Sequence, residues 1–261
     1  MVFKIYTYST SETKAKYLFE SAKFHGVEIE NLAPSTEWNG LQDKLIAMKK
    51  KLEQHAEDDI VCFVDAYDVI VNTDMDTMLK TFTDSKCEIL FGGETNLDPP
   101  VLKEHLDKYP ESPTIFRFIN TGVYIGYVRA IRKIIEWGNF LEMNDQEYIN
   151  RYFLENQDVI KIDYYANYVL NMYRISWSDL KIVEGQLVLP AMNVIPCFIH
   201  FNGMSYLDSD KDYTRQEDGG YSFMYDYPYD TTFSAIMDSK RLTQKHSVMC
   251  ILTGSTIVSA T

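Results

Sequence analysis

The stretch Ile60–Val69, which reads IVCFVDAYDV, decides the fold that the sequence predicts. It starts with an unbroken apolar run, Ile60–Val64, which is typical of a strand covered on both faces of a sheet. Asp65 and Asp68 follow this strand. Because side chains alternate along a strand, carboxylates three residues apart cannot share one of its faces. We therefore expect the chain to turn after Asp65, which would let both carboxylates point at one place.

The segments around this strand alternate between strand-like and helix-like patterns. Short apolar or alternating stretches predict further strands over 2–8, 27–32, 88–91, 123–128 and 194–201. Amphipathic stretches predict helices over 12–25, 41–52, 76–82, 130–140 and 145–156. This alternation predicts an α/β domain in which helices cover both faces of a mainly parallel sheet.

The overall composition suits a globular protein rather than a disordered or disulfide-stapled one. Of the 261 residues, 46% are hydrophobic and 24% are charged, which is close to ordinary globular usage. The segment 207–230 is polar, acidic and rich in tyrosine, as in a long loop. We therefore expect one domain over 1–206 and a C-terminal extension over 207–261, which would serve as a lid or as a contact in a homodimer.

The charge and the apolar pattern restrict the partners and the compartment. A net charge of −13 argues against nucleic acid and anionic lipid as partners, so a phosphate-bearing ligand would need a local metal ion or lysine. The cysteines lie far apart without zinc-site spacing, and we expect them to be reduced. Residues 1–10 do not have the pattern of a signal peptide, and no apolar stretch approaches the ~18 residues of a membrane span. The sequence therefore predicts a cytoplasmic protein without a membrane span, or a domain excised from a longer protein.

Candidate metal ligands lie at the ends of predicted strands. Asp65 and Asp68 follow the carboxyl end of a buried strand, where ligands bind in open α/β sheets. Two close carboxylates repel each other unless a cation joins them, and their oxygens suit Mg²⁺ or Mn²⁺. His200, in the stretch Phe198–Gly203, is either a ligand or a packing residue. If both strand ends converge, these residues form one metal site; otherwise the aspartates are solvated loop residues.

Two further motifs carry polar residues whose function the pattern alone leaves open. The stretch Phe118–Gly126 reads FINTGVYIG, in which Asn120 and Gly122 would let an amide and the backbone reach a bound hydroxyl. The same stretch also suits a loop that enters a strand. Asp145 opens a predicted helix, where it is either the N-cap or a carboxylate near an acceptor.

Several motifs occur together in one order along the chain: Glu37–Lys44, Phe63–Val69, Phe91–Glu94, Phe118–Gly126, Asn144–Gln146 and Ile199–Gly203. In this set the sequence resembles the glycosyltransferase domain of the multifunctional procollagen lysyl hydroxylases and the related viral and collagen-modifying glycosyltransferases. The resemblance covers about residues 2–206. It implies a GT-A fold, which is a Rossmann-like, mixed but mainly parallel sheet flanked by helices, and a UDP-sugar donor with Mn²⁺.

The resemblance also implies roles for individual residues. Asp65, Asp68 and His200 match the family's Mn²⁺ ligands, and Tyr67 matches the aromatic residue that stacks on uracil. Asp145 matches the acceptor side, where it would be the catalytic carboxylate. The other substrate-binding residues that the resemblance implies are Thr7, Trp38, Lys44, Glu94, Asn120, Gln146, Asn202 and Gly203.

The sequence departs from the family at two places. The family has a lysine near the diphosphate where this chain has Tyr206, so neutralisation of the phosphates falls to the metal and to Lys44. The family has an acidic run before the position of Asp145, and this chain has fewer carboxylates there, which affects how an acceptor would be held.

The reaction that the resemblance implies is transfer of glucose from UDP-glucose to galactosyl-hydroxylysine in collagen-like proteins. One alternative is transfer of galactose from UDP-galactose to hydroxylysine itself. The other is a catalytically silent sugar-binding domain on the same fold. A hydroxylase activity is not implied, because the sequence has no iron-binding region after this domain.

Overall fold

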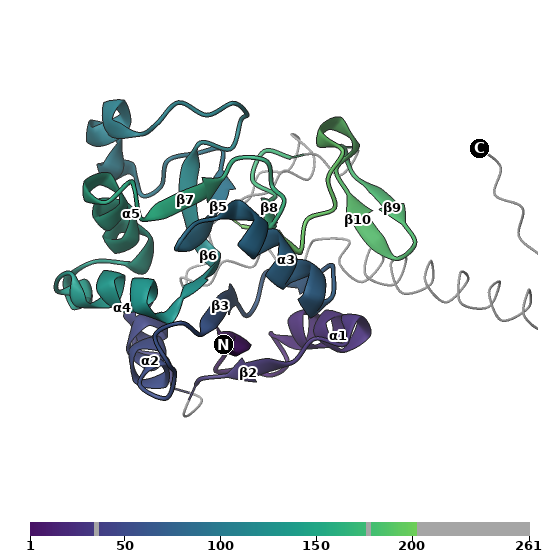
Figure 1. Cartoon of the computed structure of the whole chain (residues 1–261), viewed down its shortest axis with the longest axis horizontal. Helices are drawn as coiled ribbons and strands as arrows, with labels where there is room; N and C mark the ends of the chain where they lie inside the picture. Colours follow the sequence, from purple (N-terminus) through teal and green to yellow (C-terminus); the bar gives the residue numbers. More distant parts are fainter. Residues whose placement is uncertain (34–36, 176–178, 203–261) are drawn as a thin grey trace, which may run out of the picture.

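Within residues 1–33, 37–175 and 179–202, which the computed structural model describes, a mixed six-stranded sheet forms the centre of the molecule (Figure 1). Its order is β2–β1–β3–β6–β5–β7. The strands are β1 (Phe3–Tyr8), β2 (Ile29–Asn31), β3 (Ile60–Asp65), β5 (Ile89–Glu94), β6 (Phe118–Tyr127) and β7 (Ile160–Asp163). β1 is parallel to β2 and β3, and β5 is parallel to β7, whereas β6 is antiparallel to both of its neighbours. The predicted mixed, mainly parallel sheet is confirmed, although the strand expected over 123–128 is longer and antiparallel.

A second, smaller sheet joins three short strands that lie far apart in the sequence. Its order is β4–β11–β8, from β4 (Val69–Val71), β11 (Phe198–His200) and β8 (Val169–Asn171). His200 lies opposite Val69 on one side and Asn171 on the other. The strand predicted over 194–201 is therefore shorter, but its end falls beside the residue that follows Asp68. A hairpin of β9 (Lys181–Val183) and β10 (Gln186–Val188) lies at the end of the molecule opposite α5 (Figure 1).

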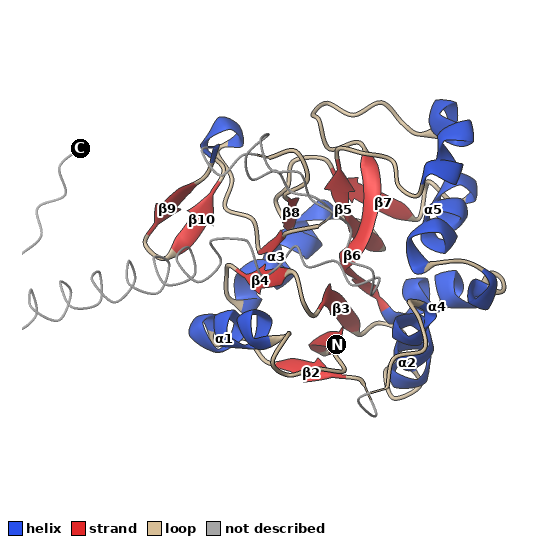
Figure 2. Ribbon diagram, turned by 180° about the vertical axis from the view of Figure 1, so that it is seen from behind, coloured by secondary structure: helices blue, strands red, loops and turns tan. Residues whose placement is uncertain are grey.

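Helices cover both faces of the six-stranded sheet, as predicted (Figure 2). One face packs against α2 (Gln42–Leu52), α4 (Val128–Glu136) and α5 (Asp145–Glu155). The other face packs against α1 (Lys16–His25) and α3 (Met75–Ser85). The 3-10 helices η1 (Pro100–Lys108), η2 (Phe140–Glu142) and η4 (Pro190–Met192) were not predicted from the sequence.

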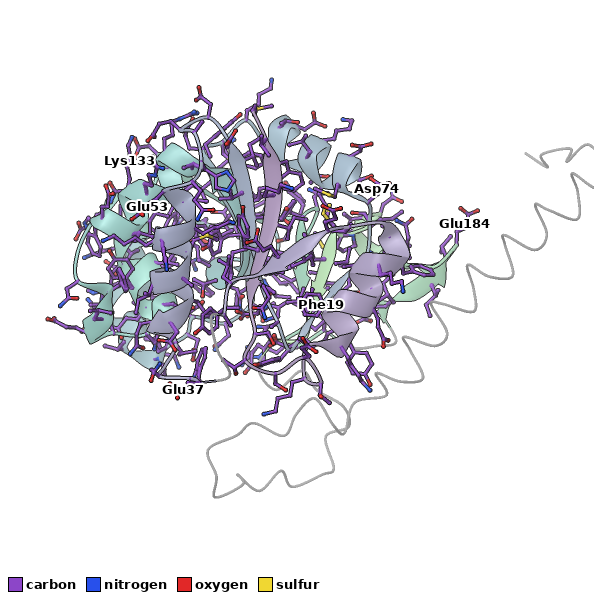
Figure 3. All side chains as sticks on the ribbon, turned by 90° about the horizontal axis from the view of Figure 1, so that it is seen from below. Phe19, Glu37, Glu53, Asp74, Lys133 and Glu184 are labelled. Atoms are coloured by element: carbon purple, nitrogen blue, oxygen red, sulfur yellow. The ribbon has the colours of Figure 1, made fainter. Side chains whose placement is uncertain are left out.

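The alternation along β3 explains how one strand serves both cores. Val61 and Phe63 pack into the core on the α2 side, whereas Cys62 and Val64 pack into the core on the α1 side. Figure 3 shows side chains filling the space on both sides of the sheet. Because side chains alternate, Asp65 has the parity of Val61 and Phe63, and it therefore points to the face that carries α2 and α5.

The helix predicted over 41–52 has the expected buried face but a later start. Leu45, Met48 and Leu52 are buried, whereas Leu41 is 44% exposed because it precedes the helix as its N-cap residue. The helix predicted over 12–25 likewise begins later, at Lys16. The expected C-terminal extension, 207–261, lies outside the described residues. Among the residues that are described, no helix is both long and apolar enough to cross a membrane.

Candidate active site

The two aspartates of the IVCFVDAYDV stretch lie on either side of the turn that sequence analysis predicted. Asp65 ends β3 in the six-stranded sheet, and Asp68 directly precedes β4 in the three-stranded sheet. The backbone N–H of Phe201 donates to the carbonyl of Asp68 at 2.7 Å, which fixes this turn to the end of β11. The chain thus changes sheets between the two carboxylates, and the same bond places His200 beside them.

Asp65, Asp68 and His200 come together in one cluster, as expected if the strand ends converge. One ligand atom from each lies within 4.8 Å of the others. His200 is 3% exposed, and its Nε2 is 3.2 Å from Asp68 Oδ2. Its Nδ1 lies 2.7 Å from Asn171 Oδ1, which accepts a hydrogen bond from the Nδ1–H group. The tautomer with the proton on Nδ1 leaves Nε2 as the nitrogen available to a metal. Asn171 is a site residue that sequence analysis missed; its only signal is an amide inside an apolar strand.

The charges of the cluster fit a divalent cation. Burial raises the pKa of the Asp65 carboxyl, although Lys44 opposes this effect. Burial acts on Asp68 in the same direction, but the neighbouring His200 outweighs it and lowers the pKa of Asp68. A donor set of two carboxylates and one imidazole suits Mn²⁺ and similar ions, and a cation would relieve the repulsion between the carboxylates.

Lys44 joins the metal cluster to Asp145 on α5. Its Nζ lies 3.0 Å from Asp65 Oδ1 and 2.6 Å from Asp145 Oδ2. Burial alone would lower the pKa of the Lys44 ammonium, but the two carboxylates outweigh it and raise the pKa above its usual value. Sequence analysis gave Lys44 a contact with the donor; the structure shows its ammonium engaged with two carboxylates of this chain.

Asp145 is not the N-cap of α5, which corrects one of the two readings that the sequence left open. The cap is Asn144, whose side-chain oxygen accepts from the backbone N–H of Glu147 at 2.7 Å. Asp145 is the first helical residue, 5% exposed, and is held by Lys44. A carboxylate at a helix N-terminus interacts favourably with the helix dipole, and Lys44 links this one to Asp65 of the metal cluster.

Glu94 links the ends of three segments beside this cluster. Its Oε2 accepts from the side-chain amides of Asn120 and Asn202, and its Oε1 accepts from the backbone N–H of Thr95 at 2.9 Å. Burial raises the pKa of Glu94 to about 7, although the donated hydrogen bonds oppose this. Three of the predicted substrate-binding residues, Glu94, Asn120 and Asn202, therefore lie in direct contact.

Two other predicted residues are engaged with the backbone. Gln146 Oε1 accepts from the backbone N–H and the hydroxyl of Thr121, both at 2.8 Å, and its Nε2 donates to the Ile119 carbonyl at 2.6 Å. The Thr7 hydroxyl is buried and donates to the Val64 carbonyl at 2.7 Å. Gln146 thus fixes β6, and Thr7 fixes β3, beside the site; their contact with a substrate stays a prediction.

Two aromatic side chains lie near the carboxyl ends of β1 and β3. The Tyr67 hydroxyl is 3.0 Å from the backbone N of Thr10 and 3.1 Å from its Oγ1, so the loop after β1 holds this ring. Sequence analysis did not single out Thr10. Trp38 is 48% exposed, and its ring lies 5.8 Å from the ring of Tyr8. Gly203, the last predicted site residue, lies outside the described residues.

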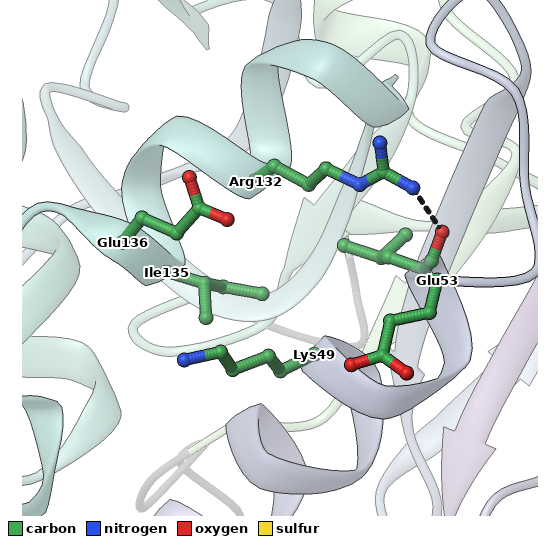
Figure 4. Close-up of a pocket in the computed structure, with 6 residues that line it drawn as sticks. Lys49, Glu53, Arg132, Ile135 and Glu136 are labelled. Carbon is green, nitrogen blue, oxygen red and sulfur yellow. Dashed lines mark hydrogen bonds between the residues drawn. The ribbon is translucent and has the colours of Figure 1, made fainter.

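A small cavity between α2 and α4 is separate from this site (Figure 4). Its volume is about 60 Å³, and an Arg132 guanidinium nitrogen donates to the Leu52 carbonyl at its edge, at 2.5 Å. The lining residues are Lys49, Leu52, Glu53, Arg132, Ile135 and Glu136. It lies at the end of α2 away from Lys44 and is too small for a nucleotide.

Comparison with known proteins gives a consistent set of relatives. A family model described as the PLOD GT domain matches residues 2–215. Procollagen-lysine,2-oxoglutarate 5-dioxygenase 1 of Mus musculus is 29% identical over 222 residues, which cover 78% of this chain and 30% of that protein. The human multifunctional procollagen lysine hydroxylase and glycosyltransferase LH3 is 32% identical over 163 residues, covering 58% of this chain and 22% of that protein. The chain thus spans about a third or less of the length of these relatives.

Two solved glycosyltransferases are among the structures that align with this chain. A glycosyltransferase involved in the glycosylation of the major capsid of PBCV-1 aligns with a TM-score of 0.45 at 14% identity, over 78% of this chain and 96% of that one. The apo structure of the bifunctional glycosyltransferase WbbM aligns with a TM-score of 0.46 at 10% identity, over 77% of this chain and 46% of that one.

Proposed function

The chain belongs to the family of PLOD glycosyltransferase domains, and from this premise we propose that it transfers glucose from UDP-glucose to galactosyl-hydroxylysine of collagen-like proteins with the help of Mn²⁺. Its mixed sheet between two helical layers agrees with the GT-A type of fold that the sequence predicted. The observation that supports the proposal most is the convergence of Asp65, Asp68 and His200 at the strand ends, where ligands bind in α/β sheets.

The metal cluster and Tyr67 would bind the two ends of UDP. Asp65, Asp68 and His200 would hold Mn²⁺, which supplies positive charge to a diphosphate and so stabilises UDP as a leaving group. Lys44 is occupied by two carboxylates, and Tyr206 replaces the lysine expected near the diphosphate. The donor phosphates would therefore depend strongly on the cation. Tyr67, held through its hydroxyl by Thr10, would present its ring to the uracil base.

Asp145 and the Glu94 cluster would bind the sugars. Asp145, which is held by Lys44, would orient and polarise the attacking acceptor hydroxyl. The carboxyl of Glu94 and the amides of Asn120 and Asn202 provide the donors and acceptors that sugar hydroxyls need. In a transfer that retains the anomeric configuration, the leaving phosphate oxygen accepts the proton of this hydroxyl, so the site needs no separate base.

A donor and acceptor panel tests the proposal. UDP release would be measured with UDP-glucose or UDP-galactose, and with a collagen peptide that carries galactosyl-hydroxylysine or free hydroxylysine, in Mn²⁺ or in EDTA. The proposal predicts fast release only with UDP-glucose, the galactosylated peptide and Mn²⁺. Preference for UDP-galactose and free hydroxylysine would indicate the galactosyltransferase instead, and acceptor-independent background in every combination would indicate a silent binding domain.

A further inference from the structure

We propose that Lys44 is a positioning residue that couples the two sides of the site, so that Asp145, which is not a metal ligand, controls how tightly the Asp65–Asp68–His200 cluster binds its cation. The inference rests on the proposed function in one respect, namely that this cluster binds a divalent cation. It goes beyond that function because it predicts that a residue on the acceptor side changes the affinity of the donor side for its cation.

The geometry places one ammonium between a metal ligand and an acceptor-side carboxylate. Lys44 lies on the first turn of α2, Asp65 at the end of β3 and Asp145 at the start of α5. The side chain of Lys44 is 11% exposed and that of Asp145 is 7% exposed, so water screens their charges poorly. The two bonds, 3.0 Å to Asp65 and 2.6 Å to Asp145, use two of the three N–H donors of the ammonium.

The same arrangement makes Asp65 a shared ligand. Its Oδ1 accepts from Lys44, while the carboxylate also belongs to the cluster that would hold the cation. The ammonium therefore competes with a cation for Asp65 and repels it, and Asp145 offsets that charge. If Asp145 loses its charge, the ammonium of Lys44 is left uncompensated and should weaken cation binding by about tenfold or more. The repulsion between two unit charges ~4–6 Å apart, at an effective dielectric constant of ~20, is large enough for a change of this size in affinity.

A purely structural role for the three residues makes a different prediction. If the two ion pairs only fasten α2 and α5 to the sheet, removing Asp145 lowers stability but leaves the metal cluster as it was. Asp145 does not belong to the group of potential metal ligands found among the described residues. An effect of Asp145 that passes through Lys44 would disappear once Lys44 is replaced, whereas a direct electrostatic effect of Asp145 on the cation would remain.

A double-mutant cycle on Mn²⁺ affinity separates the two roles. The dissociation constant for Mn²⁺ would be measured without nucleotide, from the EPR signal of free Mn²⁺, for wild type, Asp145→Asn, Lys44→Met and the double variant. Asp145→Asn should raise the constant by about tenfold, Lys44→Met should lower it, and the double variant should stay within about threefold of Lys44→Met, because Asp145 acts through Lys44. The control is Glu147→Gln, the same kind of change on the first turn of α5, at a residue paired with Arg151 at 2.9 Å; it should leave the constant unchanged.

The outcomes distinguish the inference from the function on which it rests. Equal Mn²⁺ affinity in wild type and Asp145→Asn would overturn the coupling while leaving a metal-dependent transferase intact. Wild-type protein that does not bind Mn²⁺ would overturn the proposed metal dependence and the coupling with it. If Asp145→Asn fails to fold by circular dichroism, Lys44→Met and Lys44→Arg carry the test: only the Met variant should bind Mn²⁺ more tightly than wild type, and equal affinities in the two would contradict the coupling.

Discussion

The imidazole of His200 lies directly against Gly122 of β6. A Cβ atom on residue 122 would be 2.2 Å from the His200 Cε1 and 2.8 Å from its Nε2, closer than real contacts allow. The stretch FINTGVYIG therefore contributes to the metal cluster by leaving space, because only a residue without a side chain lets this ring approach the strand. This explains Gly122 better than the backbone contact to a hydroxyl that the sequence suggested.

We expect Gly122→Ala to displace His200 and to weaken Mn²⁺ binding by about tenfold or more, the usual cost when the support of a metal ligand is lost. The matched control is Gly138→Ala, since the nearest neighbour of a Cβ there, in the Tyr148 ring, is 3.8 Å away. Both constants would be measured by EPR titration of Mn²⁺. Wild-type affinity in Gly122→Ala would show that the ring can move without consequence.

We expect Tyr67→Ala to weaken UDP binding by about 1–3 kcal/mol, the range for loss of one base–aromatic stack. Tyr67→Phe keeps the ring but loses the bonds between the hydroxyl and Thr10, so it should retain most of the affinity. Calorimetric titration of UDP in saturating Mn²⁺ measures both variants. If the Phe variant binds as weakly as the Ala variant, the hydroxyl matters rather than stacking; unchanged affinity in both would place the base elsewhere.

We expect Asp145→Asn to slow transfer by about 10²-fold at saturating Mn²⁺, because it removes the charge that would polarise the acceptor hydroxyl. The neighbouring cap provides the contrast. Asn144→Ala removes the bond to the Glu147 N–H, so it should lower the free energy of unfolding by about 1 kcal/mol and leave transfer near wild type. Initial rates and urea unfolding report the two effects, and wild-type transfer in Asp145→Asn would remove its catalytic role.

We expect Glu94 to make stability fall as pH rises from about 4.5 to about 7. Burial raises the pKa of Glu94 from 4.5 to about 7, so in this window the folded state binds a proton that the unfolded state has released. The burial of Glu94 therefore lowers the free energy of unfolding as the pH rises, with no effect below pH ~4.5 and the full effect above pH ~7. Glu94→Gln removes this titration, so it should gain up to about 3 kcal/mol on wild type between pH 4.5 and pH 8. Urea unfolding of both proteins in EDTA measures the difference; a difference that is constant with pH would contradict the account.

Much of the fold and of the metal cluster could be predicted because both depend on local patterns. The apolar run before Asp65 predicts a buried strand, and the spacing to Asp68 requires a turn, which the structure confirms. For His200 the pattern left a ligand and a packing residue open, and the family resemblance assigned it to the metal; the structure places its ring beside Asp68. The inferences about the strand and the turn need only side-chain alternation and the direction of strands.

The remaining features depend on contacts between distant segments, which the pattern does not contain. Nothing in the sequence around Lys44 reveals that two carboxylates, 21 residues and about a hundred residues away, will meet its ammonium. Asn144 and Asp145 are both good caps, and only the packing of α5 against Lys44 decides which of them caps the helix. The antiparallel direction of β6 is equally hidden, because an apolar strand reads the same in either direction.

We expect Asp65, Asp68 and His200 to hold the cation on which donor binding depends. The most direct test is calorimetric titration of UDP-glucose into wild type and His200→Ala, each in Mn²⁺ and in EDTA. We expect binding to wild type in Mn²⁺, loss of that binding in EDTA, and loss of it in His200→Ala under both conditions. Equal affinity of wild-type protein for UDP-glucose in Mn²⁺ and in EDTA would contradict this expectation.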